Sequence, residues 1–272
     1  CSLSKRYNPR FRYRDGVYCA FFCSFYRLST LGSGQGVAAV IFLGKKEVGY
    51  SEATGLYMIQ YMLHKVSIAL FSGIFFVINW KVMSHHYKNY AGYLILAYVL
   101  TVLIAIGLIL LAVYPKSHSL ILWLGNKLNF HHKLDGMLKK LENGARIMEK
   151  STSELLKDWK TIVIIVLKNL AKLCFWYSIP FLILLGSGEI SILTSLSVTS
   201  LSVMTAAVIP TPAGIGSTEL IMTSLYSLVV DVNKAGAITL LYRIATFIFP
   251  FVVGGALILA GRSLKRFLKP SR

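Results

Sequence analysis

Long apolar stretches constrain the fold of this chain more than any other feature. A helix rises about 1.5 Å per residue and the bilayer's hydrocarbon core is about 30 Å thick, so a spanning helix needs about 20 mostly apolar residues. Four stretches qualify, and a fifth, 190–209, contains more Ser and Thr. The four are 54–80, 91–114, 162–186 and 235–260. The sequence therefore predicts an all-α polytopic membrane protein with about five long spans.

The composition argues against the common alternatives. Only 15% of the 272 residues are charged, against about 25% in a typical soluble domain, so a soluble enzyme and a disordered chain both fit poorly. The 29 Lys and Arg residues outnumber the 11 Asp and Glu residues, giving a net charge of +18. These cations lie at the ends of apolar stretches and not in a soluble module, so we expect no nucleic acid partner. Because residue 1 is Cys1 and not Met, we expect that an N-terminal part is missing.

Basic residues in short loops mark the cytoplasmic side of a membrane protein. Basic segments occur at both ends of the chain, before the first long span at Lys45 and Lys46, and in the long central connection, so we expect all of them to be cytoplasmic. In that connection apolar residues recur three or four apart among charges, which predicts amphipathic helix, either solvated or lying on anionic lipid. The chain then divides into a basic segment 1–16, a first membrane half 17–114, the connection 115–160, a second membrane half 161–261 and a basic tail 262–272.

Two further apolar regions are broken by glycine-rich turns. Region 17–43 is interrupted at 32–36, and region 190–230 is interrupted at 210–216. The expected orientation requires each region to return to the side that it left, so each is predicted to form a broken or re-entrant hairpin. The same unit would then occur twice in opposite orientation, as an inverted repeat, although unrelated helices of similar composition are the alternative. Broken helices at matching positions indicate a transporter-type site near the midplane.

The Pro/Gly turn at 210–219 is the strongest local motif. Its prolines end the preceding helix, its glycines permit a tight turn, and Ser217 or Thr218 can cap the next helix. Free amides at a helix N-terminus bind anions, so Gly214, Gly216, Ser217 and Thr218 are candidate anion ligands. The alternative is a purely structural kink.

Ionisable residues within predicted spans are costly unless they are paired or functional. Glu219 either satisfies amides at the helix start or takes a proton or a substrate ammonium, and it is the natural partner of Arg243. Snorkelling to the interface explains Lys168 better than Lys172. The cations within predicted spans are Lys65, Lys168, Lys172 and Arg243. A cavity lined by these four residues would be net positive, which favours the head group of an anionic phospholipid as ligand.

No catalytic motif is recognisable in this chain. The sequence contains no nucleophile elbow, no Walker A loop, no His-Glu-x-x-His and no Cys-x-x-Cys, so we assign no catalytic residue and leave enzyme activity open. The adjacent histidines at 85–86 and 131–132 and the four cysteines lack the spacing of a metal site. We therefore expect neither a metal ion nor a cofactor.

The sequence resembles the C-terminal signature of the lysylphosphatidylglycerol synthetase transmembrane region. The resemblance lies in residues 206–219 (AAVIPTPAGIGSTE), in Arg243 downstream of them, and in Gly254 and Gly255 of the last span. Residues 31–49 are similar to that family's earlier Thr-Gly-Gly-Gln-Pro turn and the Lys-Lys-x-Gly loop after it.

The resemblance extends over residues 17–262 and adds Gly34, Gln35 and Gly36 to the candidate site. Two positions depart from the family's first motif, because Ser33 stands where a glycine is expected and Gly36 where a proline is expected.

The resemblance implies a bacterial-type cell membrane protein that translocates lysyl-phosphatidylglycerol between leaflets. In full-length members a separate soluble acetyltransferase-like domain makes that lipid, and the family acts in lipid aminoacylation and in resistance to cationic antimicrobial peptides. Our leading hypothesis is a protein that translocates or binds an anionic or aminoacylated phospholipid. The alternatives are a membrane component of a phosphatidylglycerol lysyltransferase, with its synthase domain in cis or in trans, and a membrane scaffold or transporter of another solute.

Overall fold

The computed structural model describes residue 4 and residues 8–113, 158–186, 188–209 and 211–260. Within these ranges every regular element is a helix, and four helical segments are long and apolar enough to cross a membrane. The predicted all-α polytopic membrane fold is therefore confirmed. Predictions made for residues 115–157 and 262–272 lie outside the described residues. The four segments are Tyr50–Ile78, Lys88–Gly107, Trp159–Ile183 and Val232–Leu259.

The long helices form two groups along the chain. In the first half α4 leads through the short helix α5 and the turn η1 into α6, while in the second half α9 continues into α10, and α13 continues through η3 into α14. Each group coincides with apolar stretches of the sequence. The bounds are α4 (Tyr50–Ile78), α5 (Trp80–His86), η1 (Lys88–Tyr90), α6 (Ala91–Val113), α9 (Trp159–Tyr177), α10 (Ile179–Ile183), α13 (Val232–Arg243), η3 (Ile244–Ile248) and α14 (Phe249–Leu259).

The stretch expected to form a fifth long span is instead a core helix. It forms α11 (Ile192–Ala206), whose 15 residues rise only about 22 Å, less than the thickness of the hydrocarbon core. Most of its residues are buried, and its hydroxyls bond to neighbouring backbone: Ser195 donates to the carbonyl of Tyr177 (2.8 Å) and Ser197 to that of Phe75 (3.0 Å). Except for Thr205, whose buried hydroxyl oxygen has no partner among the described residues, the Ser and Thr side chains of α11 are thus hydrogen-bonded inside the protein.

Both predicted hairpins are present. In the first, α2 (Tyr13–Ser29) turns into α3 (Gly34–Gly44) through Leu31 and Gly32, which have positive φ values of 51° and 102°. In the second, α11 turns into α12 (Ser217–Tyr226) through the short helix η2 (Pro212–Gly214). Both turns therefore use left-handed backbone, which glycine adopts without steric cost and other residues only with strain.

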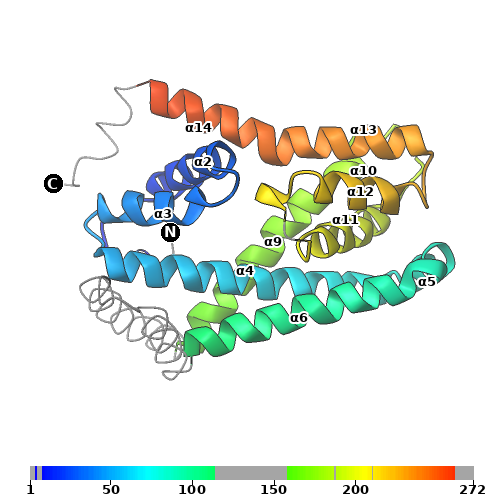
Figure 1. The fold of residues 1–272 in the computed structure, drawn as a ribbon, viewed down its shortest axis with the longest axis horizontal. Coiled ribbons are helices and arrows are strands. Elements are labelled where there is room, and N and C mark those ends of the chain that lie inside the picture. Colours follow the sequence, from blue (N-terminus) through cyan, green and yellow to red (C-terminus); the bar gives the residue numbers. More distant parts are fainter. Residues whose placement is uncertain (1–3, 5–7, 114–157, 187, 210, 261–272) are drawn as a thin grey trace, which may run out of the picture.

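The two hairpins enter the bundle from opposite ends and meet tip to tip (Figure 1). The first lies at the end where α4 begins, and the second lies towards α5. Each packs in the same way: its second helix contacts the span that follows it, and its first helix contacts a long span of the other half. This reciprocal packing, in which the first helix of each hairpin contacts the other half, is the arrangement that an inverted repeat predicts. The contacting pairs are α3 with α4 and α2 with α14 for the first hairpin, and α12 with α13 and α11 with α4 for the second.

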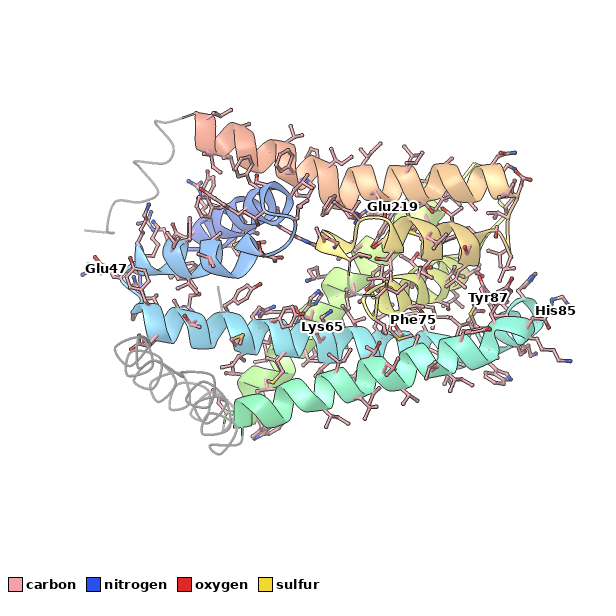
Figure 2. All side chains as sticks on the ribbon, viewed as in Figure 1. Glu47, Lys65, Phe75, His85, Tyr87 and Glu219 are labelled. Carbon is pink, nitrogen blue, oxygen red and sulfur yellow. The ribbon has the colours of Figure 1, made fainter. Side chains whose placement is uncertain are left out.

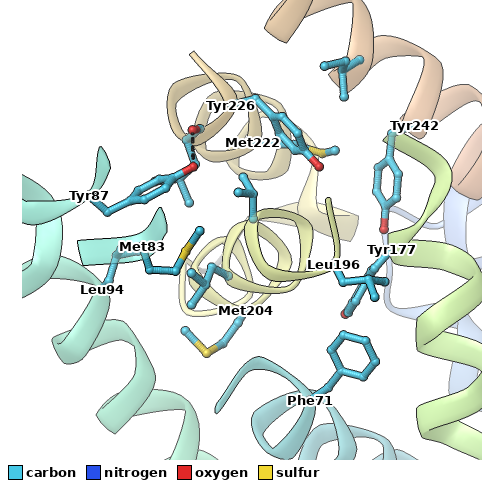
Figure 3. Close-up of a cluster of buried hydrophobic side chains, with 14 of the residues drawn as sticks. Phe71, Met83, Tyr87, Leu94, Tyr177, Leu196, Met204, Met222, Tyr226 and Tyr242 are labelled. Carbon is cyan, nitrogen blue, oxygen red and sulfur yellow. Dashed lines mark hydrogen bonds between the residues drawn. The ribbon is translucent and has the colours of Figure 1, made fainter. Parts of the chain in front are cut away.

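The main hydrophobic core surrounds α11 and holds the second hairpin in place (Figure 3). Phe71 of α4 meets Tyr177 edge to face at 5.2 Å between ring centroids. The buried hydroxyl of Tyr87, just after α5, donates to the carbonyl of Leu225 at 2.8 Å. Burial raises the pKa of Tyr87 far above its ordinary value, so the hydroxyl remains a neutral donor.

A close helix contact holds the first hairpin against α14. A β-carbon on Gly254 would lie only 2.3 Å from the carbonyl oxygen of Phe21, so glycine is required for this approach. Beside it, the rings of Phe25 and Phe251 stack at 5.2 Å with an interplanar angle of 2°. The glycine-containing last span is thus a packing surface for α2.

The last span widens into a π-helical turn, η3, directly after Arg243. Pro250 follows this turn, and because proline has no amide hydrogen it cannot donate to the carbonyl four residues earlier. Single π turns inside α-helices are commonly found at functional sites. Here the turn presents Thr246 and Phe247 to the centre of the bundle.

Candidate functional site

A cavity of about 520 Å³ lies where the two hairpin tips meet. A β-carbon on Gly32 of the first tip would lie 3.0 Å from the backbone nitrogen of Ala213 in the second. Both residues line the cavity, together with side chains from α4, α9, α13 and η3. The cavity is therefore lined by both halves of the protein.

Three cations line this cavity: Arg27 from α2, Lys65 from α4 and Arg243 from α13. No Asp or Glu is among the described residues that line it. Figure 2 shows Lys65 in the middle part of α4, between Glu47 at one end of the bundle and His85 at the other. The polar site thus lies deep within the helical bundle.

Arg243 is held by the chain's own carboxylate. Its Nε donates to Oε1 of Glu219 at 2.6 Å, and the Arg243 side chain is only 10% exposed while that of Glu219 is 35% exposed. The second oxygen of Glu219 accepts the backbone amide of Gly216 at 2.8 Å. The predicted pairing of Glu219 with Arg243 is confirmed, and the carboxylate also satisfies an amide at the start of α12.

Arg27 is a cavity residue that sequence reasoning missed. Its guanidinium carbon lies 5.4 Å from the ring centroid of Phe247, and that of Arg243 lies 4.1 Å from the same ring. One aromatic ring thus contacts both guanidinium groups. Neither Arg27 nor Lys65 forms an ion pair within the part of the chain that the structure describes. The interruption of an apolar stretch by Arg27, close before a glycine turn, is the signal that could have identified it.

Neutral polar groups complete the lining. They include Gln35 at the start of α3, Thr218 at the start of α12, and His64, which adjoins Lys65. Nδ1 of His64 is buried and has no hydrogen-bond partner among the described residues. A buried polar atom without a partner carries a desolvation cost.

The sequence comparisons agree with this architecture. Residues 5–254 match the family described as the lysylphosphatidylglycerol synthase TM region. The chain belongs to this family. A UPF0104 membrane protein of Pyrococcus horikoshii is 38% identical over 86 residues, which are 31% of this chain and 25% of that protein. The matched segment is thus a quarter of this relative, and no solved structure matches the chain.

Only some of the candidate residues of the Pro/Gly turn at 210–219 line the cavity. Gly214 and Thr218 line it, whereas Ser217 is buried behind it with its hydroxyl 2.6 Å from that of Thr211. Gly216 has a φ of 84° and lies outside the lining. Because its amide bonds to Glu219, the predicted anion position at this helix start is taken by an internal carboxylate.

The first motif contributes one side chain to the cavity. Gln35 lines it, while Gly34 and Gly36 do not. They allow close packing instead, because a β-carbon on Gly34 would meet Thr30 at 2.6 Å and one on Gly36 would meet Tyr57 at 2.9 Å. Leu31 and Gly32 make the left-handed turn, whereas Ser33 has helical backbone with a φ of −72°, so position 33 does not require glycine.

The two lysines of α9 do not reach the cavity lining. Lys168 is exposed, and the Nζ of the half-buried Lys172 lies 5.7 Å from the ring centroid of Trp176, which does line the cavity. Lys172 therefore lies beside the cavity, close enough for its charge to act on the lining residue His64, without itself being part of the lining. Of the predicted cations, Lys65 and Arg243 are therefore brought together, while Lys168 and Lys172 are not.

A second hollow, of about 690 Å³, lies between α4, α6 and α11. Its lining is almost wholly apolar and includes Gly73, Tyr98 and Leu201 but no charged side chain. Such a surface can contact lipid tails but cannot neutralise a phosphate. The charged cavity between the hairpin tips is therefore the better candidate for an anionic ligand.

Proposed function

We propose that this protein binds and translocates an anionic phospholipid across the cell membrane, with the head group passing through the cavity between the hairpin tips. The observation that carries the proposal is the set of cavity cations, Arg27, Lys65 and Arg243, which within the described part of the chain are opposed by one carboxylate, that of Glu219. Intramembrane cations are costly and are typical of substrate pathways. A lipid phosphate is the abundant anion at this location.

The depth of these cations supports the proposal. Lys65 lies about 22 Å along α4, whose 29 residues extend about 43 Å, so it is near the middle of the helix. Arg243 lies about 17 Å along the segment Val232–Leu259, which has 28 residues. Snorkelling to an interface does not account for a cation at mid-span, whereas a head-group site between the leaflets does.

The hairpins suggest how passage could occur. They enter from opposite ends of the bundle and touch at Gly32 and Ala213, so the cavity wall contains a contact between the two halves. Broken elements that surround a midplane site and belong to opposed repeats are the usual framework for alternating access. We propose that separation of the two tips opens the cavity toward one leaflet or the other. The end of the bundle where α4 begins would then lie on the cytoplasmic side.

Lipid transfer in proteoliposomes tests this function. The full chain is reconstituted with tail-labelled phosphatidylglycerol, and transfer is followed by quenching of the label in the outer leaflet. We expect Arg27→Gln and Lys65→Gln each to lower the transfer rate about tenfold, the effect of losing about 1.4 kcal/mol of interaction.

Matched controls separate the cavity from general charge. Arg14→Gln removes an exposed arginine from the same helix as Arg27, and Lys81→Gln removes an exposed lysine from α5. Both controls should transfer lipid at the wild-type rate. Wild-type rates in both cavity variants would refute the assignment of this cavity as the head-group path.

The family also points to a partner and a more specific substrate. We propose that a soluble acetyltransferase-like synthase domain, in the same chain or in another, acts with this membrane region in aminoacylated lipid metabolism. The support is membership of the lysylphosphatidylglycerol synthase TM region family over residues 5–254. Co-purification of such a domain with the tagged full chain from its native membrane tests this proposal, and recovery of the chain without one would contradict it.

A further inference from the structure

Each hairpin tip is bonded to one of the cavity arginines. In the first hairpin, the backbone amide of Gly32 donates to the carbonyl of Arg27 at 2.6 Å, so this arginine and the tip share one turn. In the second hairpin, Glu219 accepts the amide of Gly216 with one oxygen and the Nε of Arg243 with the other. Arg27 is therefore fixed to the first tip, and Arg243 is connected to the second tip through Glu219.

The two arginines contact the same aromatic ring. Their guanidinium carbons lie 5.4 Å and 4.1 Å from the ring centroid of Phe247, so these carbons are at most 9.5 Å apart, the sum of the two distances. At this range the charge of Arg243 acts on Arg27. Because the arginines belong to different halves of the protein, their repulsion opposes the contact between Gly32 and Ala213.

We infer that the phosphate of a phospholipid head group bridges Arg27 and Arg243 and thereby holds the two hairpin tips together. This inference rests on the proposed head-group function. A phosphodiester has two non-bridging oxygens, so each guanidinium can donate to one of them through charge-assisted hydrogen bonds of about 2.7–2.9 Å. Two such bonds, with the phosphate between them, fit the separation of the guanidinium groups. The anion also neutralises the repulsion between the arginines, so binding and contact of the tips favour each other.

Both guanidinium groups have donors for this bridge. Among the described residues, Arg243 bonds to Glu219 through Nε only, and Arg27 has no carboxylate partner. The other cations near the cavity are placed differently. Lys65 lies on α4, and Lys172 lies on α9 beside the cavity, so neither belongs to a hairpin. These lysines add positive potential to the site but do not connect the ligand to a tip.

The bridge uses a part of the head group that phosphatidylglycerol and its aminoacyl esters share. Aminoacylation esterifies a hydroxyl of the terminal glycerol and leaves the phosphodiester unchanged. The ammonium groups of the aminoacyl part take no part in the bridge. We therefore expect phosphatidylglycerol and its lysyl ester to have the same effect on the tips.

The separation of the tips, measured with and without lipid, tests the inference. Nitroxide labels are attached at Ser29→Cys and Ile215→Cys in a full chain whose native cysteines are replaced by alanine. Ser29 and Ile215 are exposed, flank the two tips and do not line the cavity. Pulsed electron paramagnetic resonance in mild detergent measures the distance between the labels. We expect saturating dioctanoyl phosphatidylglycerol, or its lysyl ester, to raise the ratio of near to separated tips about tenfold, within the usual range for coupling between a ligand and a conformational change.

Variants separate the bridge from general charge. Arg27→Gln removes the repulsion as well as the bridge, so its tips should be together more often than those of wild type without lipid, and lipid should have no further effect. Arg27→Lys retains the charge and should retain the response. Lys65→Gln should need more lipid but reach the wild-type ratio at saturation, because Lys65 is not fixed to a tip. The exposed-site control Arg14→Gln should behave as wild type. Size-exclusion chromatography identifies any variant that fails to fold, and the contrast between Arg27→Lys and Lys65→Gln then tests the bridge.

Calorimetry on the same labelled chain measures binding and separates this inference from the proposed function. Binding of phosphatidylglycerol without a change in tip separation, or with an equal change in Arg27→Gln, would overturn the bridge and leave a lipid site in place. Failure to bind both phosphatidylglycerol and its lysyl ester would overturn the proposed function. Glycerophosphoglycerol is the same phosphodiester without tails. Equal affinity for it, with the same effect on the tips, would support the bridge but assign it to a soluble ligand, and would overturn lipid translocation.

Discussion

The ion pair between Glu219 and Arg243 permits a prediction in which stability and affinity change in opposite directions. Removing one partner of a fully buried pair costs about 3–5 kcal/mol. Because the Glu219 side chain is 35% exposed, water screens part of this interaction, and we expect Glu219→Gln to lower the free energy of unfolding by about 2 kcal/mol. The glutamine oxygen can still accept the amide of Gly216, so the substitution isolates the charge.

A double-mutant cycle tests this magnitude. Arg243→Gln leaves the partly hydrated Glu219 with its amide bond, so we expect a loss of about 1 kcal/mol, and about 1.5 kcal/mol for the double variant. The coupling energy would then be about 1.5 kcal/mol, measured by reversible unfolding in mixed detergent. Effects of the two substitutions that add to within about 0.3 kcal/mol would refute the assignment of a coupled pair.

The same substitution makes the cavity more positive, because the carboxylate that opposes its cations among the described residues is lost. We therefore expect Glu219→Gln to bind dioctanoyl phosphatidylglycerol about three to ten times more tightly than wild type, an effect of about 1 kcal/mol. Calorimetry of the purified full chain in mild detergent measures this affinity. Weaker anion binding by a folded Glu219→Gln protein would show that Glu219 supports the ligand directly and does not merely oppose its charge.

Further predictions concern packing and burial. Gly254→Ala should lower the free energy of unfolding by about 1–3 kcal/mol, because the new methyl group meets the carbonyl of Phe21, whereas Gly236→Ala, with open space around it, should not destabilise. Tyr87→Phe should cost about 1–2 kcal/mol by leaving the carbonyl of Leu225 without its donor. Because burial raises the pKa of Tyr87, the stability that this hydroxyl provides is present below its unfolded pKa of about 10 and declines at higher pH; a pH-independent difference between wild type and Tyr87→Phe from pH 8 to pH 11 would contradict this.

The long helices and both hairpins could be predicted from sequence, because their determinants are local. Apolar length defines α4 and α6, glycine and proline break the helices, and the positions of basic residues require each hairpin to return. The sequence overestimates the length of α11 because hydropathy alone cannot distinguish a lipid-facing span from a core helix in which most Ser and Thr side chains bond to neighbouring groups, such as the carbonyls of Tyr177 and Phe75.

The cavity was only partly predictable, because membership in it depends on contacts between distant segments. Lys65 and Arg243 were identified by their depth alone. Arg27 enters the cavity through the packing of α2 against α14 and its contact with Phe247, about 220 positions away in the sequence, which no local pattern encodes. Lys172 has similar depth in its helix, but its ammonium group lies over the ring of Trp176 and not in the cavity lining.

The exchanged packing of the hairpins has a consequence for assembly. The first helix of each hairpin packs against its own half but is completely covered only when the other half is present, since α2 also lies against α14 and α11 against α4. Neither half is therefore a complete folding unit, and the chain resembles an intertwined dimer joined into one polypeptide. Because Arg27 and Arg243 come from different halves, the charged cavity cannot exist before the halves have intertwined. A half-chain inserted in the membrane would have its spans but no site.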